Sequence, residues 1–77
     1  MEDRVVTRLR KNEMEEIVIA VRTYEGNEFV YTRVFYGARG QETKPTKKGV
    51  TVPLQLYRVF RRSISLLDEV MAKAGWT

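Results

Sequence analysis

Two β-rich segments separated by a short turn constrain this chain more than any other feature. Residues 17–24 and 29–36 are dominated by β-branched and aromatic side chains, which are typical of strands. The turn at Glu25-Gly26-Asn27 contains two residues, Gly26 and Asn27, that tolerate a positive φ. Because so short a connection permits only antiparallel pairing, the sequence predicts a β-hairpin.

Both faces of this predicted hairpin carry apolar residues. In residues 17–24, one face has Ile17, Ile19 and Val21, and the other has Val18, Ala20, Arg22 and Tyr24. An antiparallel sheet with one face in water alternates more cleanly between apolar and polar residues. We therefore expect either that both faces are covered or that the second face binds something flat.

The rest of the chain predicts two further strands and one helix. Residues 4–10 form a first strand, residues 37–46 a loop with Gly and Pro as breakers, and residues 50–52 a short fourth strand. A helix begins at Pro53, whose fixed φ suits a first turn, and ends near Gly75. Apolar residues recur along it at helical spacing: Leu56, Val59, Phe60, Ile64, Leu67, Val70, Met71 and Ala74. The predicted fold class is α+β, a four-stranded antiparallel sheet followed by one C-terminal amphipathic helix.

The size of the chain predicts a single domain over residues 1–77 that pairs with a second copy. At 77 residues, burial of apolar surface alone gives little stability, and the absence of cysteine excludes disulfides. Leu66 widens the apolar stripe of the predicted helix, which suits a helix that covers its own sheet and also contacts a partner. An ordinary core helix with one exposed leucine fits the pattern equally well.

The absence of both cysteine and histidine removes most catalytic and metal-binding chemistry. It excludes thiol nucleophiles, thiolate zinc sites and the commonest general base. Neighbouring carboxylates such as Glu15 and Glu16 diverge on a strand and do not converge on a cation. Residues 37–40 lack phosphate-loop spacing. We expect no enzyme, no metal site and no cofactor.

The chain also shows no signal for a membrane or for secretion. No apolar run approaches the roughly 20 residues that span a bilayer. The first four residues, Met-Glu-Asp-Arg, are followed by no apolar signal-peptide core. We expect an intracellular protein with no membrane partner, in the cytoplasm or nucleoid of a prokaryotic or viral system or in a eukaryotic nucleus.

The net charge of +4 lies entirely in the second half of the chain. Residues 41–77 hold seven basic and three acidic residues, and the stretch from Lys44 to Arg62 holds six basic residues and no acid. A stretch of one sign attracts polyanions such as nucleic acid. An ordinary solvated surface accounts for the same charge about equally well.

Basic residues also lie close to aromatic residues on the predicted hairpin. Arg22 is near Tyr24, and Arg33 is near Phe35 and Tyr36. Aromatic rings accept stacked bases while Lys and Arg hold phosphates. This combination favours single strands, because a duplex hides its base faces. Packing within a core is the plain alternative for each aromatic ring.

Three segments, residues 19–26, 32–36 and 43–52, resemble the positive cofactor four family of transcriptional-coactivator-type single-stranded DNA-binding domains. The most specific part is the Lys-Pro-Thr-Lys-Lys-Gly run of residues 44–49, in the right order behind the hairpin. Tyr57 occupies the family's aromatic position in the helix. The resemblance covers about residues 17–72. It implies a curved four-stranded sheet, a homodimer joined largely through helices, and single-stranded DNA bound with little sequence preference.

The resemblance also implies roles for the matching residues. Tyr24 and Tyr36 would stack on bases, and Arg22 and Arg33 would hold phosphates or base edges. The loop residues Lys44, Lys47 and Lys48 would clamp phosphates, with Gly49 letting the backbone turn close to the bound strand. The helix residues expected in the core or the dimer contact are Val59, Phe60, Ile64, Leu67 and Met71.

This chain departs from the family pattern at two places. Glu25 follows the first aromatic residue, and Glu15 and Glu16 precede the second strand, where family members usually have basic residues. Arg8 and Arg10, with Lys11, are the further candidates that would compensate from the first strand.

These observations predict non-enzymatic binding of single-stranded DNA in transcription, replication or repair. The first alternative is an RNA-binding domain that uses the same surface, since contacts to the 2′-hydroxyl, which distinguish RNA, cannot be read from these residues. The second is a protein-interaction module that recruits transcription or replication proteins through the helix stripe and the apolar sheet face.

Overall fold

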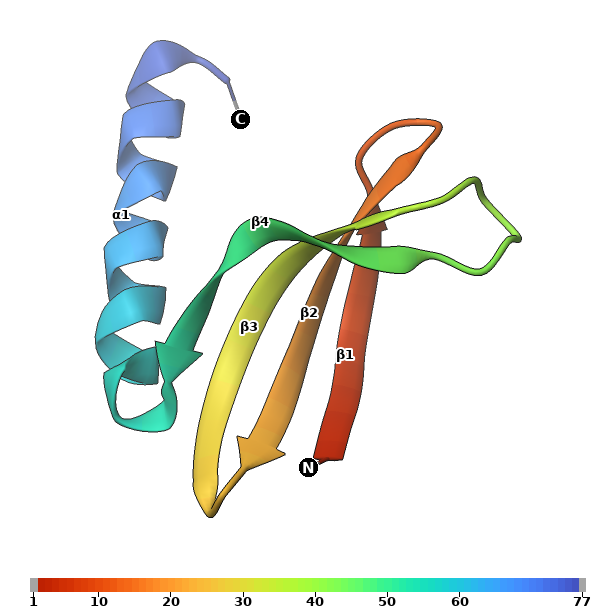
Figure 1. Cartoon of the computed structure of the whole chain (residues 1–77). Coiled ribbons are helices and arrows are strands. Elements are labelled where there is room, and N and C mark those ends of the chain that lie inside the picture. The colour runs from red at the N-terminus through yellow and green to blue at the C-terminus, as the bar shows by residue number, and fades with distance from the viewer. Residues whose placement is uncertain (1, 77) are drawn as a thin grey trace.

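The structure, a computed structural model, describes residues 2–76. Four strands are followed by a short 3₁₀ turn and one helix, and each strand pairs antiparallel with the next in the order β1-β2-β3-β4. The elements are β1 Glu2–Arg10, β2 Glu15–Tyr24, β3 Asn27–Tyr36, β4 Lys44–Pro53, η1 Leu54–Leu56 and α1 Tyr57–Ala74. Figure 1 shows that the sheet is curved, most visibly along β3 and β4. The predicted α+β class and its order of elements are confirmed.

The β2–β3 hairpin closes through a turn of two residues, one fewer than predicted. Glu25 and Gly26 both have positive φ, 49° and 78°, which is the conformation that a type I′ turn requires. Asn27 pairs directly with Tyr24 and therefore belongs to β3. The twist of such a turn matches that of the flanking strands, so the hairpin continues in register over its full length.

The fourth strand is much longer than the predicted 50–52, because the Lys-rich segment is part of it. The loop that precedes β4 covers only residues 37–43. Pro45 suggested a loop, but β4 is an edge strand, where a residue without a backbone N–H is tolerated. Lys44, Lys47 and Lys48 therefore lie on a strand held against β3.

A bulge interrupts the pairing of β3 with β4. Between the pairs Phe35–Pro45 and Arg33–Gly49, Val34 alone faces residues 46–48. The Thr46 hydroxyl donates to the Val34 carbonyl at 2.6 Å and accepts from the Lys48 backbone N–H at 3.2 Å. These two bonds fix the backbone of the bulge, which is a common device for bending a strand.

The two faces of the sheet differ in character. Residues opposite each other on neighbouring strands share a face, and the register defines an arginine face and an aliphatic face. The arginine face carries Arg8, Arg10, Glu16, Val18, Ala20, Arg22, Tyr24, Phe29, Tyr31, Arg33 and Phe35. The aliphatic face carries Leu9, Ile17, Ile19, Val21, Val30 and Val34.

The small core lies on the arginine face. Val18 and Ala20 are completely buried there, with Tyr31 beside them and Phe35 packed against the group. Val18 lies directly between Arg8 on β1 and Arg33 on β3. Arginine can bury its apolar stem while its charged end stays in water, so both positions suit a residue that flanks the core.

The helix does not cover the sheet, so that part of the prediction is wrong for a single chain. In Figure 1, α1 stands beside the sheet next to the end of β4, and its contacts lie mainly with β4 and η1. Pro53 ends β4 instead of opening the helix, and η1 then turns the chain away from the sheet. None of the helical residues is buried.

The predicted end of the helix is confirmed. Gly75 has φ 74°, and its N–H donates to the Ala72 carbonyl. The Trp76 N–H donates to the Met71 carbonyl at 2.9 Å, which completes a Schellman motif. The helix is therefore well terminated even though none of its residues is buried.

Gly49 is required by the close approach of β4 to β3. A Cβ at this position would lie 2.3 Å from the Thr32 carbonyl oxygen, whereas a Cβ at Gly40 would meet no atom within 4 Å. Both glycines have positive φ. We expect Gly49→Ala to destabilise the protein by about 1–3 kcal/mol more than Gly40→Ala does, because only the first is overpacked. Chemical denaturation of both variants measures the difference, and equal losses would contradict the steric explanation.

Candidate nucleic-acid interface

A hollow on the arginine face brings aromatic rings and guanidinium groups together. It has a volume of about 220 Å³ and is lined by Arg22, Tyr24, Phe29, Tyr31, Arg33 and Thr51. The guanidinium carbon of Arg22 lies 5.8 Å from the Tyr24 ring centroid, and that of Arg33 lies 5.7 Å from the Tyr31 centroid. Both distances are within the range of a cation–π interaction.

Two neighbouring hollows extend this surface along β3. One of about 250 Å³ shares Arg22, Tyr31 and Arg33 with the first and adds Asp3, Phe35 and Pro45. The Asp3 carboxylate lies 3.5 Å from Arg22 Nε. A third, of about 520 Å³, also includes Phe35 and lies next to the loop 37–43. We call the first two together the aromatic groove, defined by Arg22, Tyr24, Phe29, Tyr31, Arg33 and Phe35. The third is the arginine pocket, defined by Arg8, Arg10, Glu16, Arg39 and Thr43.

The sheet divides the residues predicted for the site into two groups. Arg22, Tyr24 and Arg33 lie together in the aromatic groove. Tyr36 is paired with Glu15 and Lys44, and strand alternation therefore places it on the aliphatic face. It does not share the groove with Tyr24, and Phe35 lies there in its place.

Phe29 and Tyr31 are groove residues that the sequence analysis missed. Both have the same parity along β3 as Arg33 and Phe35, so a period of two was already visible in the sequence. Tyr36 was assigned to the site by its matching position in the family resemblance, which does not specify the face of the sheet. Neighbouring residues on a strand point to opposite faces, and residues two apart point to the same face.

The lysines of β4 are exposed and border the sheet edge. Lys48 lies close enough to Glu15 to help lower the pKa of that carboxyl, although the larger cause is the hydrogen bond that the Asn12 amide donates to it at 2.8 Å. Lys44 is paired with Tyr36. The close backbone approach that Gly49 allows is to Thr32 on β3.

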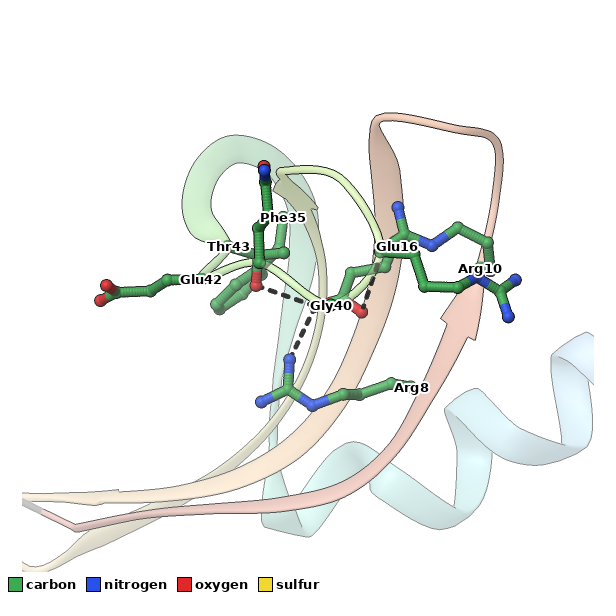
Figure 2. Close-up of a pocket in the computed structure, with 9 residues that line it drawn as sticks. Arg8, Arg10, Glu16, Phe35, Gly40, Glu42 and Thr43 are labelled. Carbon is green, nitrogen blue, oxygen red and sulfur yellow. Dashed lines mark hydrogen bonds and ion pairs between the residues drawn. The ribbon is translucent and has the colours of Figure 1, made fainter.

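Glu16 is the centre of the arginine pocket, as Figure 2 shows. Its Oε1 accepts from Arg8 Nη1 at 2.7 Å and from the Thr43 hydroxyl at 2.9 Å, and its Oε2 lies 3.9 Å from Arg10 Nη2. Arg10 Nη1 also donates to the Gly37 carbonyl at 3.0 Å. Glu16 and Arg10 thus tie β1 and β2 to the loop 37–43.

These contacts lower the pKa of Glu16 below its ordinary value of 4.5, although the residue is only 8% exposed. The hydrogen bond from the Thr43 hydroxyl is the largest cause, and the bond and charge of Arg8 add to it, so together they outweigh the effect of burial. Glu16 is therefore a carboxylate at neutral pH. An acid at this position departs from the family pattern, and the structure gives it a role: Glu16 joins β1 to the loop 37–43.

Residues 2–76 contain no group of three or more Asp or Glu side chains placed to hold a metal ion. In the same part of the chain, no helix combines the length and the apolar character needed to cross a bilayer.

The sequence profile of the family described as Transcriptional Coactivator p15 (PC4) matches residues 11–63, well over half of the chain. The chain belongs to the PC4 family. This family binds single-stranded DNA and acts in transcription or replication. The match spans β2, β3, β4 and the first part of α1, which include the aromatic groove and the lysines of β4. No curated protein matches the sequence at a significant level.

Solved structures of PC4 homologues share the fold. The homologue from Burkholderia pseudomallei superposes with a TM-score of 0.77 at 21% identity, over 87% of this chain and 90% of its own. A bacteriophage T5 homologue, implicated in recombination-dependent DNA replication, gives a TM-score of 0.64 at 20% identity, over 97% and 83%. Structural similarity at identities this low establishes the architecture alone. The chemistry of the site therefore has to be argued from the residues of this chain.

The lowered pKa of Glu16 predicts a specific loss of stability in acid. Because its pKa is lower in the folded state than the 4.5 of the unfolded chain, Glu16 contributes stability above pH 4.5 that is lost as the pH falls through the folded value. We expect Glu16→Gln to be less stable than the wild type at pH 7, and this deficit to shrink below pH 4.5. Chemical denaturation between pH 7 and pH 3 measures it.

Glu28→Gln is the control, since it removes an exposed carboxylate at the far end of the hairpin. It should leave the wild-type acid dependence in place. A stability deficit of Glu16→Gln that is the same at every pH would contradict the assignment.

Proposed function

We propose that this protein binds single-stranded DNA without catalysis and with little sequence preference, at DNA that has been opened for transcription, replication or repair. The observation that carries the proposal is the aromatic groove, which gathers arginine and aromatic side chains on one face of β2 and β3. Membership of the PC4 family supports the same function.

The groove offers two kinds of contact to a single strand. The Tyr24 ring is 48% exposed beside Arg22, so a base can stack on it while the guanidinium meets the backbone. Arg33 lies over Tyr31 and presents its charge in the same hollow. Stacking and phosphate contacts carry no base code, which accounts for weak sequence preference. A duplex has no free base faces for these rings.

Tyr36, Lys44, Lys47 and Lys48 form the second part of the proposed interface. Tyr36 is 54% exposed at the end of β3, and all three lysines are exposed on β4. The proposal gives the lysines phosphate contacts and Tyr36 a separate stacking position. The bulge at residues 46–48 supports this role, because it holds the lysine backbone in one conformation.

We further propose that two copies of the chain form a homodimer through α1. The apolar side of this helix is exposed along its length, with Val59, Ile64, Leu67 and Val70 each about half exposed or more. An amphipathic helix draws most of its stability from packing its apolar side. The side chains of a second helix would supply the cover that the sheet does not give.

We expect the protein to bind a labelled single strand of about 20 nucleotides more tightly than the matching duplex, because the aromatic rings can stack only on unpaired bases. This length exceeds the roughly 4–16 nucleotides that a single OB-fold covers in proteins that bind single strands in this way. Tyr24→Ala combined with Tyr36→Ala should weaken this binding by about 1–3 kcal/mol for each stacked base lost. Fluorescence anisotropy measures both effects, and the single variants separate the two positions.

Trp76→Ala is the matched control, since it removes an exposed aromatic ring beyond the helix. Equal and weak binding of both DNA forms would leave only a general basic surface and defeat the proposal. Competition with an RNA strand of the same sequence decides between DNA and RNA.

The dimer predicts a molecular mass of twice 9.0 kDa in solution. Leu67→Glu should raise the dimer dissociation constant by at least about tenfold, because it places an unpaired charge in an apolar contact. Sedimentation equilibrium measures this change. Ser65→Glu is the control, since Ser65 lies with Arg58, Arg61 and Arg62 on the polar side of the helix. A monomeric wild type would refute the dimer.

A further inference from the structure

The arginine pocket is continuous with the aromatic groove and comes from a different part of the chain. Phe35 lines both hollows, so a strand that leaves the groove past Phe35 reaches the pocket directly. The pocket takes Arg8 and Arg10 from β1 and Arg39 from the loop 37–43. Arg8 on β1 and Arg33 on β3 lie on the same face of the sheet with β2 between them. Their backbones are therefore separated by two strand spacings, or roughly 10 Å.

The charges of the pocket favour an anion. Three arginines line it together with two acids, Glu16 and Glu42, and Figure 2 shows the Glu42 carboxylate pointing away from the Glu16 cluster. Within residues 2–76, the side chain of Arg39 forms no hydrogen bond or ion pair. Arg39 is exposed on the loop and therefore presents an unused guanidinium to the pocket.

Glu16 already shows how the pocket holds an oxyanion. Its Oε1 accepts one bond from a guanidinium and one from a hydroxyl, the donor set that proteins commonly offer to a phosphate oxygen. The carboxylate lies at the centre of the cluster, where it neutralises Arg8. A phosphate entering the pocket would meet this negative charge.

We propose that the arginine pocket binds a backbone phosphate of the same single strand that occupies the aromatic groove, and that Glu16 limits this binding by acting as a competing internal anion. This inference rests on the proposed function and deepens it. It assigns to Arg8, Arg10 and Arg39 a phosphate contact, and to Glu16 an inhibitory role in binding in addition to its structural one.

The test compares two charge changes with a matched control. Glu16→Gln keeps the shape of the side chain and removes the competing anion, Arg39→Ala removes a cation, and Glu28→Gln makes the same charge change as the first at the far end of the hairpin. For a strand of about 20 nucleotides, we expect Glu16→Gln to raise the affinity about three- to tenfold and Arg39→Ala to lower it similarly. Charges about 4 Å apart that are screened as in bulk water interact at this scale. Fluorescence anisotropy over a range of salt concentrations measures both.

The salt dependence and the strand length identify the contact. Losing one phosphate contact in Arg39→Ala should make the log–log salt slope shallower by about 0.7. Both changes should fade for strands of about 4 nucleotides, near the lower limit of such sites, because these fill the groove without reaching the pocket. Effects of the same size at every length would overturn the inference, since the pocket would then not lie on the path of the strand.

The outcomes separate this inference from the proposed function. If the wild type binds single strands and Tyr24→Ala weakens the binding, the function stands. If Glu16→Gln and Arg39→Ala then differ no more than Glu28→Gln does from the wild type, the phosphate pocket is refuted. Arg39→Ala removes no hydrogen bond or ion pair among residues 2–76, so it tests the phosphate contact even if Glu16→Gln loosens the loop 37–43.

Discussion

The register of β2 against β3 is the constraint on which the rest of the structure depends. It places Arg33 opposite Val18 and Tyr31 opposite Ala20. The same backbone pairs therefore determine the positions of the core residues and of the groove residues. A shift of one residue would move every arginine and aromatic ring of one strand to the other face. The two positive φ angles at Glu25 and Gly26 set this register from the turn.

Much of the fold was predictable from local pattern, and the errors have distinct physical causes. The hairpin and the end of the helix depend on neighbouring residues, so the sequence analysis found them. The length of β4 was missed because Pro45 is acceptable at a sheet edge, which is a property of the topology. The position of α1 was missed because an amphipathic pattern shows that a helix needs an apolar partner and does not say which one.

The candidate site was predicted in the same uneven way. Arg22, Tyr24 and Arg33 were found because the hairpin alone brings them together, whereas Tyr36 was grouped with them against the strand period. Thr43 and Glu16 are 27 residues apart in the sequence, so no local pattern could predict the hydrogen bond between them. Because Arg33 flanks Val18 and Tyr31 is itself a core residue, the groove and the core share residues. A lost arginine therefore costs packing as well as charge, and binding data need a stability measurement beside them.

The unburied helix has a consequence for how the protein behaves at different concentrations. Since none of the helical residues is buried, packing within one chain gives α1 little free energy of folding. Where a second copy supplies it, folding and assembly form one equilibrium, and the melting temperature rises with protein concentration. Dilution would then produce single chains in which α1 unfolds and becomes accessible to proteases. The concentration of the protein would therefore determine how fast it is degraded.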